Sequence, residues 1–272
     1  MSRIDDLFAR LRGSGRKALI PYVTAGDPSL EITGKLVLAL AERGADLIEL
    51  GVPFSDPLAD GPTIQRASQR ALRGKTTLRG ILALVRELRR KTATPLVLMT
   101  YYNPIHAYGE EKFLEHAKEV GVDGVIVPDL PPDEGGAFLD RAEKAGIDGI
   151  LLAAPTSPDE RLRMIASRSR GFLYYVSLTG VTGSRDRLAA DLAPKLDHLR
   201  ALTDRPVAVG FGISTPGQAA LAARHADGVI VGSALIDVWE KAGPGPEGIQ
   251  AVGDYIARLR SALDAASVVA PA

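Results

Sequence analysis

The sequence has no cysteine, a single tryptophan and three methionines among its 272 residues. Without cysteine there can be no disulfide bond, no thiolate catalysis and no cysteine-ligated metal, and the composition fits a reducing cytoplasm. Net charge is also lacking, because 33 Lys and Arg balance 33 Asp and Glu. No electrostatic pull towards nucleic acid or a membrane surface is therefore expected.

Long apolar runs are missing too. No stretch approaches the roughly 18 apolar residues that a membrane-spanning helix needs. The N-terminal segment carries an acidic pair, Asp5 and Asp6, and has no apolar core of a secretion signal. We therefore expect a cytoplasmic protein. Its length suits one domain over residues 1–272, with a helix over residues 1–15 and a frayed tail over residues 265–272.

One sequence pattern occurs four times, starting at Gly44, Gly121, Gly146 and Ala226. In each, small residues and an Asp lead into a short, continuous apolar run. Such runs are typical of strands buried on both faces, as in a parallel sheet covered by helices. With four further runs, the expected strands cover residues 18–23, 44–50, 95–99, 121–127, 146–152, 172–176, 206–209 and 226–231.

Amphipathic stretches separate the expected strands. They cover residues 30–42, 78–90, 111–120, 134–144, 159–167, 192–202, 215–224 and 248–263, and a further helix starts at Pro62. Eight βα units predict the α/β class and a single (β/α)8 TIM barrel with an extra N-terminal helix. An open doubly wound sheet is the alternative, which eight consecutive units make less favourable.

Glycine-rich segments follow the sixth, seventh and eighth expected strands, at residues 179–184, 210–214 and 232–234. Backbone N–H groups at glycines and at a helix N-terminus bind anions, and the last two loops are the usual phosphate position in such barrels. Glycines that merely turn the chain are the alternative for any one loop. All three together favour a phosphate site, with the loop at 179–184 as a lid.

Glu49 ends the second expected strand, between apolar neighbours. It is either a structural acid paired to a cation or a catalytic acid/base, because burial raises the pKa of a carboxyl group towards neutrality. Asp56 and Asp60 follow in the next loop, and spacing alone does not choose between them. The four histidines are dispersed, and no metal-ligand spacing is present.

Several segments together resemble the motifs of the tryptophan synthase α subunit family, in that family's order and spacing. They cover residues 21–28, 49–65, 98–104, 127–131, 177–183, 210–214 and 232–234. The resemblance implies cleavage of indole-3-glycerol phosphate to indole and glyceraldehyde 3-phosphate, a retro-aldol step without a cofactor or a metal. It implies that Glu49 and Asp60 are the catalytic pair and leaves Asp56 to order the loop.

The resemblance also implies two sets of substrate-binding residues. Those around the indole are Tyr22, Tyr101, Ile126, Tyr174 and Phe211. Those around the phosphate are Thr182, Gly183, Gly212, Ile213, Gly232 and Ser233. Tyr22 stands where the family often has Phe, so its hydroxyl needs a partner. Either Tyr101 or Tyr102 could face the ligand, and we favour Tyr101.

Members of this family work as αββα (α2β2) complexes with a β subunit that carries pyridoxal phosphate. We expect docking at residues 53–60, 103–108 and 128–133, and apolar side chains in or next to these segments include Tyr102, Pro104, Ile105 and Pro131. Two other readings remain: another phosphate-binding barrel enzyme, and a barrel subunit that binds ligand without catalysis. The Glu49–Asp60 segment argues against both.

Overall fold

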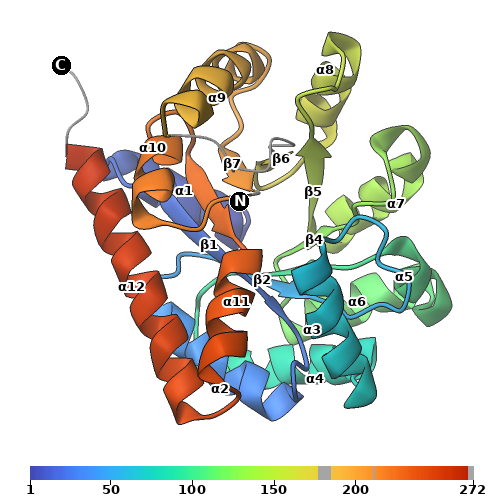
Figure 1. Ribbon diagram of the computed structural model, residues 1–272. Coiled ribbons are helices and arrows are strands. Elements are labelled where there is room, and N and C mark those ends of the chain that lie inside the picture. Colours follow the sequence, from blue (N-terminus) through green and yellow to red (C-terminus); the bar gives the residue numbers. More distant parts are fainter. Residues whose placement is uncertain (177–184, 211, 269–272) are drawn as a thin grey trace.

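Eight parallel strands close into a barrel in the computed structural model, which describes residues 1–176, 185–210 and 212–268 (Figure 1). Each strand pairs with the next, and β8 pairs with β1. The strands are β1 (Ala18–Thr24), β2 (Ile48–Gly51), β3 (Leu96–Met99), β4 (Gly124–Ile126), β5 (Asp148–Ala153), β6 (Leu173–Val176), β7 (Val207–Gly210) and β8 (Gly228–Val231). All eight predicted strands are confirmed, and the closed order excludes an open sheet.

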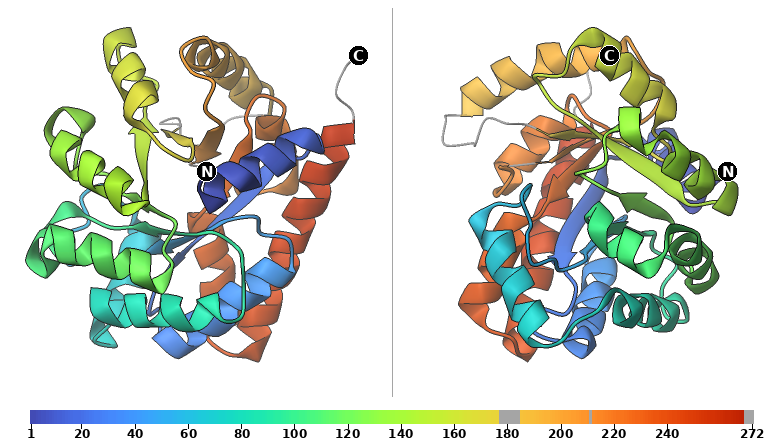
Figure 2. Two further views of the ribbon diagram at one scale, coloured as in Figure 1. Left: turned by 180° about the vertical axis from the view of Figure 1, so that it is seen from behind. Right: turned by 90° about the vertical axis from the view of Figure 1, so that its right-hand side faces the viewer.

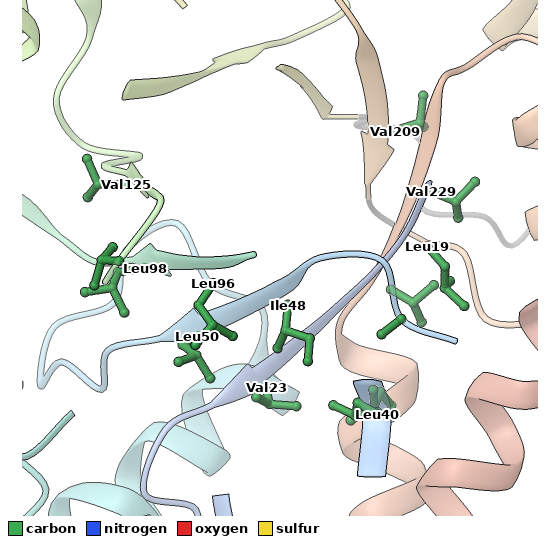
Figure 3. Close-up of a cluster of buried hydrophobic side chains, with 14 of the residues drawn as sticks. Leu19, Val23, Leu40, Ile48, Leu50, Leu96, Leu98, Val125, Val209 and Val229 are labelled. Carbon is green, nitrogen blue, oxygen red and sulfur yellow. The ribbon is translucent and has the colours of Figure 1, made fainter. Parts of the chain in front are cut away.

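Alternate residues of each strand face the barrel interior and the helices, because side chains along a strand point to opposite faces. The outward set, which includes Leu19, Ile48 and Leu96, packs into a large core beneath the helices (Figure 3). The inward set, which includes Val97 and Ile126, fills the barrel itself. Burial on both faces explains why the strands read as continuous apolar runs.

Twelve described helices surround the barrel (Figures 1 and 2). They are α1 (Arg3–Gly13), α2 (Leu30–Glu42), α3 (Pro62–Arg73), α4 (Leu78–Arg89), α5 (Tyr102–Tyr108), α6 (Glu110–Val120), α7 (Pro132–Ala145), α8 (Asp159–Arg168), α9 (Arg185–Arg200), α10 (Pro216–Ala223), α11 (Ser233–Ala242) and α12 (Pro246–Val268). The single tryptophan, Trp239, lies on α11, is 5% exposed and packs into the outer core.

Helix α5 corrects one expectation, since residues 103–108 were predicted to be a loop. Seven residues are too few to show an apolar period, and Pro104 lies in the first turn, where a helix tolerates proline. Ile105 on this helix is fully buried in the core. Its apolar side chain therefore serves packing, and the expectation that it faces a partner was wrong.

Two helix boundaries also differ from prediction. Helix α9 begins at Arg185 rather than at residue 192, because its charged opening residues show no apolar spacing. Helix α12 continues to Val268, so the first four residues of the segment expected as a tail are helical. The local sequence there is rich in alanine, the residue with the highest helix propensity.

Helix α1 lies across the N-terminal end of the barrel (Figure 2, left). Ser2 caps it with a capping box in which its hydroxyl accepts the Asp5 N–H, and the Asp5 carboxylate accepts the Ser2 N–H. Its apolar face joins the interior cluster, where the Phe8 and Phe172 rings lie 5.7 Å apart. The predicted extra helix therefore closes the floor of the barrel.

The aspartate of the recurring sequence pattern has a common structural role at three of its four positions. Each of these carboxylates accepts the backbone N–H of a residue near the start of the preceding strand. The bonds run to Asp46, Asp123 and Asp227 from Leu19, Leu96 and Val207, at 2.8, 2.8 and 3.0 Å. Before β6, the Ser169 hydroxyl accepts the Leu151 N–H at 3.1 Å in the same way. These bonds fix the register of neighbouring strands.

Asp123 accepts more hydrogen bonds than the other two aspartates. It is 5% exposed and accepts hydrogen bonds from Arg3 at 2.7 Å, from the Leu96 N–H and from Arg89. A buried carboxylate needs such partners to offset its lost hydration. Asp123 thereby joins α1 and α4 to the start of β3.

We expect Asp123→Ala to lower the free energy of unfolding by about 3–5 kcal/mol, because it leaves buried guanidinium and N–H groups without their acceptor. Glu119→Ala removes an exposed ion pair with Arg86 and should cost less than about 1 kcal/mol. Urea unfolding of the two variants measures the difference. Equal midpoints for Asp123→Ala and wild type would contradict the role of Asp123.

Candidate active site

The C-terminal ends of the strands bring four of the predicted site residues to one end of the barrel. Tyr22 and Glu49 are register partners on β1 and β2. Ile126 is the last residue of β4, and Tyr174 lies near the end of β6. Ile126 and Tyr174 belong to the interior cluster. This is the end opposite α1, and it is the end at which barrels of this kind carry their active sites.

Glu49 has an unusual environment for a carboxyl group. It is 1% exposed, and neither of its oxygens has a hydrogen-bond partner among the described residues. Burial, and secondarily the charge of Asp60, raise the pKa of Glu49 to about 8. The structural alternative, an acid paired to a cation, does not hold for the part of the chain that the structure describes. Glu49 is therefore protonated at neutral pH, and both of its oxygens are available to a ligand.

Asp60 lies in the loop between β2 and α3, directly before the Gly61 N-cap of α3. Its N–H donates to the Pro57 carbonyl at 3.1 Å, and its own carbonyl accepts from Gln65 Nε2 at 2.9 Å. Burial raises the pKa of Asp60 to about 6, opposed by a hydrogen bond from the Tyr101 hydroxyl. The loop thus holds a second carboxyl group whose charge acts on Glu49.

Tyr101, rather than Tyr102, contacts the loop that carries Asp60. Tyr101 is 5% exposed, and its hydroxyl accepts the Ala59 N–H at 2.9 Å and donates to Asp60. The Tyr102 hydroxyl instead donates to Glu110. Asp56 is exposed on the same loop as Asp60. Tyr101 and Asp60 therefore lie in contact with each other, and the roles predicted for them stay predictions.

Two glycines make room for the tyrosines of the site, and sequence reasoning missed both roles. A Cβ at Gly51 would lie 2.0 Å from the Tyr22 hydroxyl oxygen, and one at Gly210 would lie 2.5 Å from that of Tyr174. The sequence feature that could have indicated both roles is the glycine at the last position of β2 and of β7. The Tyr22 hydroxyl also accepts a long hydrogen bond, 3.4 Å, from the Thr24 hydroxyl, which supplies the expected partner.

The expected phosphate residues are described only in part. Helix α11 starts at Ser233 with Gly232 as its N-cap and has no side-chain cap, so first-turn N–H groups remain for an anion. Gly232 lies beside Tyr22, since a Cβ there would be 3.5 Å from the Tyr22 Cβ. Gly212 has a φ of +77°, which favours glycine, and Ile213 is buried. Thr182, Gly183 and Phe211 lie outside the described residues.

No group of three or more His, Cys, Asp or Glu side chains among the described residues could hold a metal ion. None of the described helices is both long and apolar enough to cross a membrane.

The fold is a (β/α)8 barrel, and buried carboxyl groups with raised pKa values at this end of it are typical of an enzyme. The sequence profile of the family described as tryptophan synthase alpha chain matches residues 8–262. The chain belongs to this family. Its activity is the α reaction of tryptophan biosynthesis, the cleavage of indole-3-glycerol phosphate, so it is a lyase as the resemblance implied.

Individual relatives match over nearly their whole length. The tryptophan synthase alpha chain of Geobacter sp. (strain M21) is 52% identical over 263 residues, which are 97% of this chain and 98% of that protein. That of Acidiphilium cryptum is 52% identical over 269 residues, with the same coverage. The crystal structure of tryptophan synthase subunit alpha from Legionella pneumophila str. Paris is 41% identical, with a TM-score of 0.89 and coverage of 97% and 99%.

The raised pKa of Glu49 makes stability depend on pH. Between about pH 4.5 and 8 the folded chain keeps the Glu49 proton and the unfolded chain does not. The free energy of unfolding therefore falls as pH rises through this window, by up to about 1.4 kcal/mol per pH unit. Asp60 lowers the free energy of unfolding in the same direction as pH rises from about 3.8 to 6.

Glu49→Gln should remove the Glu49 part of this slope, so the variant gains stability over wild type as pH rises from 5 to 9. Urea unfolding at each pH measures the gain. Asp56→Asn, on the exposed part of the same loop, is the control and should follow wild type. Parallel curves for Glu49→Gln and wild type would show that Glu49 titrates normally.

Proposed function

We propose that Glu49 is both the acid and the base of the cleavage and that Asp60 stabilises the charge that develops on the indole. The observation that carries the proposal is the buried Glu49 carboxyl, with a pKa of about 8 and two oxygens without partners among the described residues. A carboxyl of this kind is protonated at neutral pH and still loses its proton readily.

The steps balance without a cofactor. Protonated Glu49 donates its proton to C3 of the indole, which places positive charge on the ring nitrogen. Asp60, as a carboxylate, accepts the ring N–H and stabilises that charge. The Glu49 carboxylate then removes the proton from the glycerol hydroxyl next to the ring. The C–C bond breaks, its electron pair returns to the ring, and indole and an aldehyde leave.

The pocket for this reaction would combine apolar walls with few polar anchors, as ligand sites generally do. The proposed walls are Tyr22, Tyr101, Ile126, Tyr174 and Phe211, of which the first four are buried. The proposed phosphate contacts are Thr182, Gly183, Gly212, Ile213, Gly232 and Ser233. The uncapped N-terminus of α11 supports the last two. Phosphate held there would orient the substrate for the proton transfers.

We expect Glu49→Gln to lower kcat by about 10²–10⁴-fold or more, since an amide cannot carry the proton and one group serves two steps. Release of indole from indole-3-glycerol phosphate measures the loss. Asp60→Asn should lower kcat less, because it keeps an acceptor and loses only the charge. Asp56→Asn is the control and should retain activity. Near wild-type cleavage by a folded Glu49→Gln variant would remove Glu49 from the mechanism.

The same assay separates the competing functions. A barrel enzyme for another phosphorylated substrate would release no indole. A subunit that binds without catalysis would bind the substrate and leave it intact. The neighbouring carboxyl groups with raised pKa values favour catalysis over binding alone.

We further propose that a β subunit docks on the loop that carries Asp60, in an α2β2 complex. Leu58 on this loop is 86% exposed, so its side chain would be buried by a partner that docks there. A partner that covers Leu58 would restrain the turn at Pro57 and Asp60, two residues away. The cytoplasmic location expected from the composition belongs to the same proposal.

Leu58→Asp should weaken binding of the β subunit by about tenfold or more, because it places a charge in a desolvated contact. Isothermal titration with a tryptophan synthase β subunit gives the dissociation constant, and light scattering of the complex gives its stoichiometry. The control is Ala201→Asp, which adds the same charge at an exposed position near the N-terminal end of the barrel. Unchanged affinity of Leu58→Asp would place the interface elsewhere.

A further inference from the structure

A cavity that is open to solvent lies at the end of the barrel opposite Glu49. Its volume is about 610 Å³, and α1, α8 and the segment before β7 line it. Its apolar side includes Phe8, Leu202 and Pro206, and its cationic side consists of Arg12, Arg163 and Arg205. The volume lies within the range of about 300–1,000 Å³ that is typical of small-molecule sites.

The three arginines that line this cavity are unpaired. Among the residues that the structure describes, no carboxylate forms an ion pair with any of their guanidinium groups. Three other arginines on these segments are paired. These are Arg3 with Asp123 at 2.7 Å, Arg161 with Asp133 at 3.4 Å, and Arg200 with Asp227 at 3.3 Å. Arg12, Arg163 and Arg205 come from three separate segments and meet at this cavity without an ion pair in the described part of the chain.

Two acidic residues, Asp5 and Asp204, also line the cavity and offset only part of the charge of the three arginines. The Asp5 carboxylate is engaged by the Ser2 N–H at the start of α1. Asp204 is exposed. Neither pairs with an arginine of the cavity in the described part of the chain.

A smaller cavity of about 100 Å³ adjoins the first and shares Phe8, Arg12 and Pro206 with it. Lys17 lines this smaller cavity. Burial lowers the pKa of Lys17, and the positive charges of Arg200 and Arg12 lower it further, against the opposing charge of Asp227. Basic side chains thus outnumber acidic ones around the two cavities, and an anion would relieve the repulsion between the positive charges.

We propose that this cavity binds a small amphipathic anion, with a carboxylate or phosphate on Arg12, Arg163 and Arg205 and an apolar body on Phe8, Leu202 and Pro206. Guanidinium groups bind both kinds of anion through paired N–H donors. The ligand would join α1 to α8 and to the start of β7. Because it binds the folded chain, it raises the free energy of unfolding. The site is distinct from the cleavage site, so it does not depend on the roles of Glu49 and Asp60.

The test uses four probes in a low-salt buffer: 1-naphthoate, 1-naphthyl phosphate, the neutral 1-naphthol and inorganic phosphate. Titration calorimetry gives their affinities, and thermal unfolding gives their stabilisation. Both naphthyl anions should bind and raise Tm, and their ratio tells carboxylate from phosphate preference. Naphthol or inorganic phosphate that bind as tightly as the naphthyl anions would overturn the amphipathic assignment.

Arginine variants locate the site, since an aromatic anion can also enter the end that carries Glu49. Arg12→Met, Arg163→Met and Arg205→Met should each weaken the binding of the preferred naphthyl anion about tenfold, through loss of a charged hydrogen bond. Arg10→Met, on α1 but outside the cavity, is the matched control and should bind as wild type. All four variants should cleave indole-3-glycerol phosphate normally. Binding that survives the three cavity substitutions would overturn the proposal.

Discussion

The hydrogen bonds from strand N–H groups to Asp46, Asp123 and Asp227 fix the register on which the rest of the molecule depends. Side chains alternate along a strand, so a slip of one residue would exchange its two faces. Glu49 would then face the helices, and Ile48 would enter the barrel. Carboxylates at the N-terminal end of the barrel therefore determine where Glu49 lies at the C-terminal end. The aspartate of the recurring sequence pattern supplies these carboxylates.

The interior that these contacts create determines the chemistry of Glu49. Apolar and aromatic side chains fill the barrel from the floor at α1 up to Tyr174, which leaves no charge in the described structure to compensate the acid. The unfavourable burial of one carboxyl is thus supported by many apolar contacts and by the buried ion pairs beneath them. Burial of the Glu49 carboxyl group therefore lowers the stability of the fold and raises the reactivity of the group.

Much of this could be predicted from sequence because the signals were local. Apolar runs predicted all eight strands, and a carboxylate at a strand end predicted the place of Glu49. Helix α5 was missed because seven residues carry no period, and the start of α9 because its first residues are charged. Contacts such as Gly51 against Tyr22 were beyond prediction, since they join separate strands. The cavity with Arg12, Arg163 and Arg205 likewise arises only when three distant segments meet.

The scarcity of tryptophan gives the molecule a built-in spectroscopic probe. Trp239 is the only residue of its type, and it is buried on α11, the helix whose first turn lies beside Tyr22 at the top of the barrel. Its emission spectrum therefore reports the packing of a single helix against the core. A shift to longer wavelength marks the moment at which water reaches α11, and the chain needs no engineered fluorophore to reveal it.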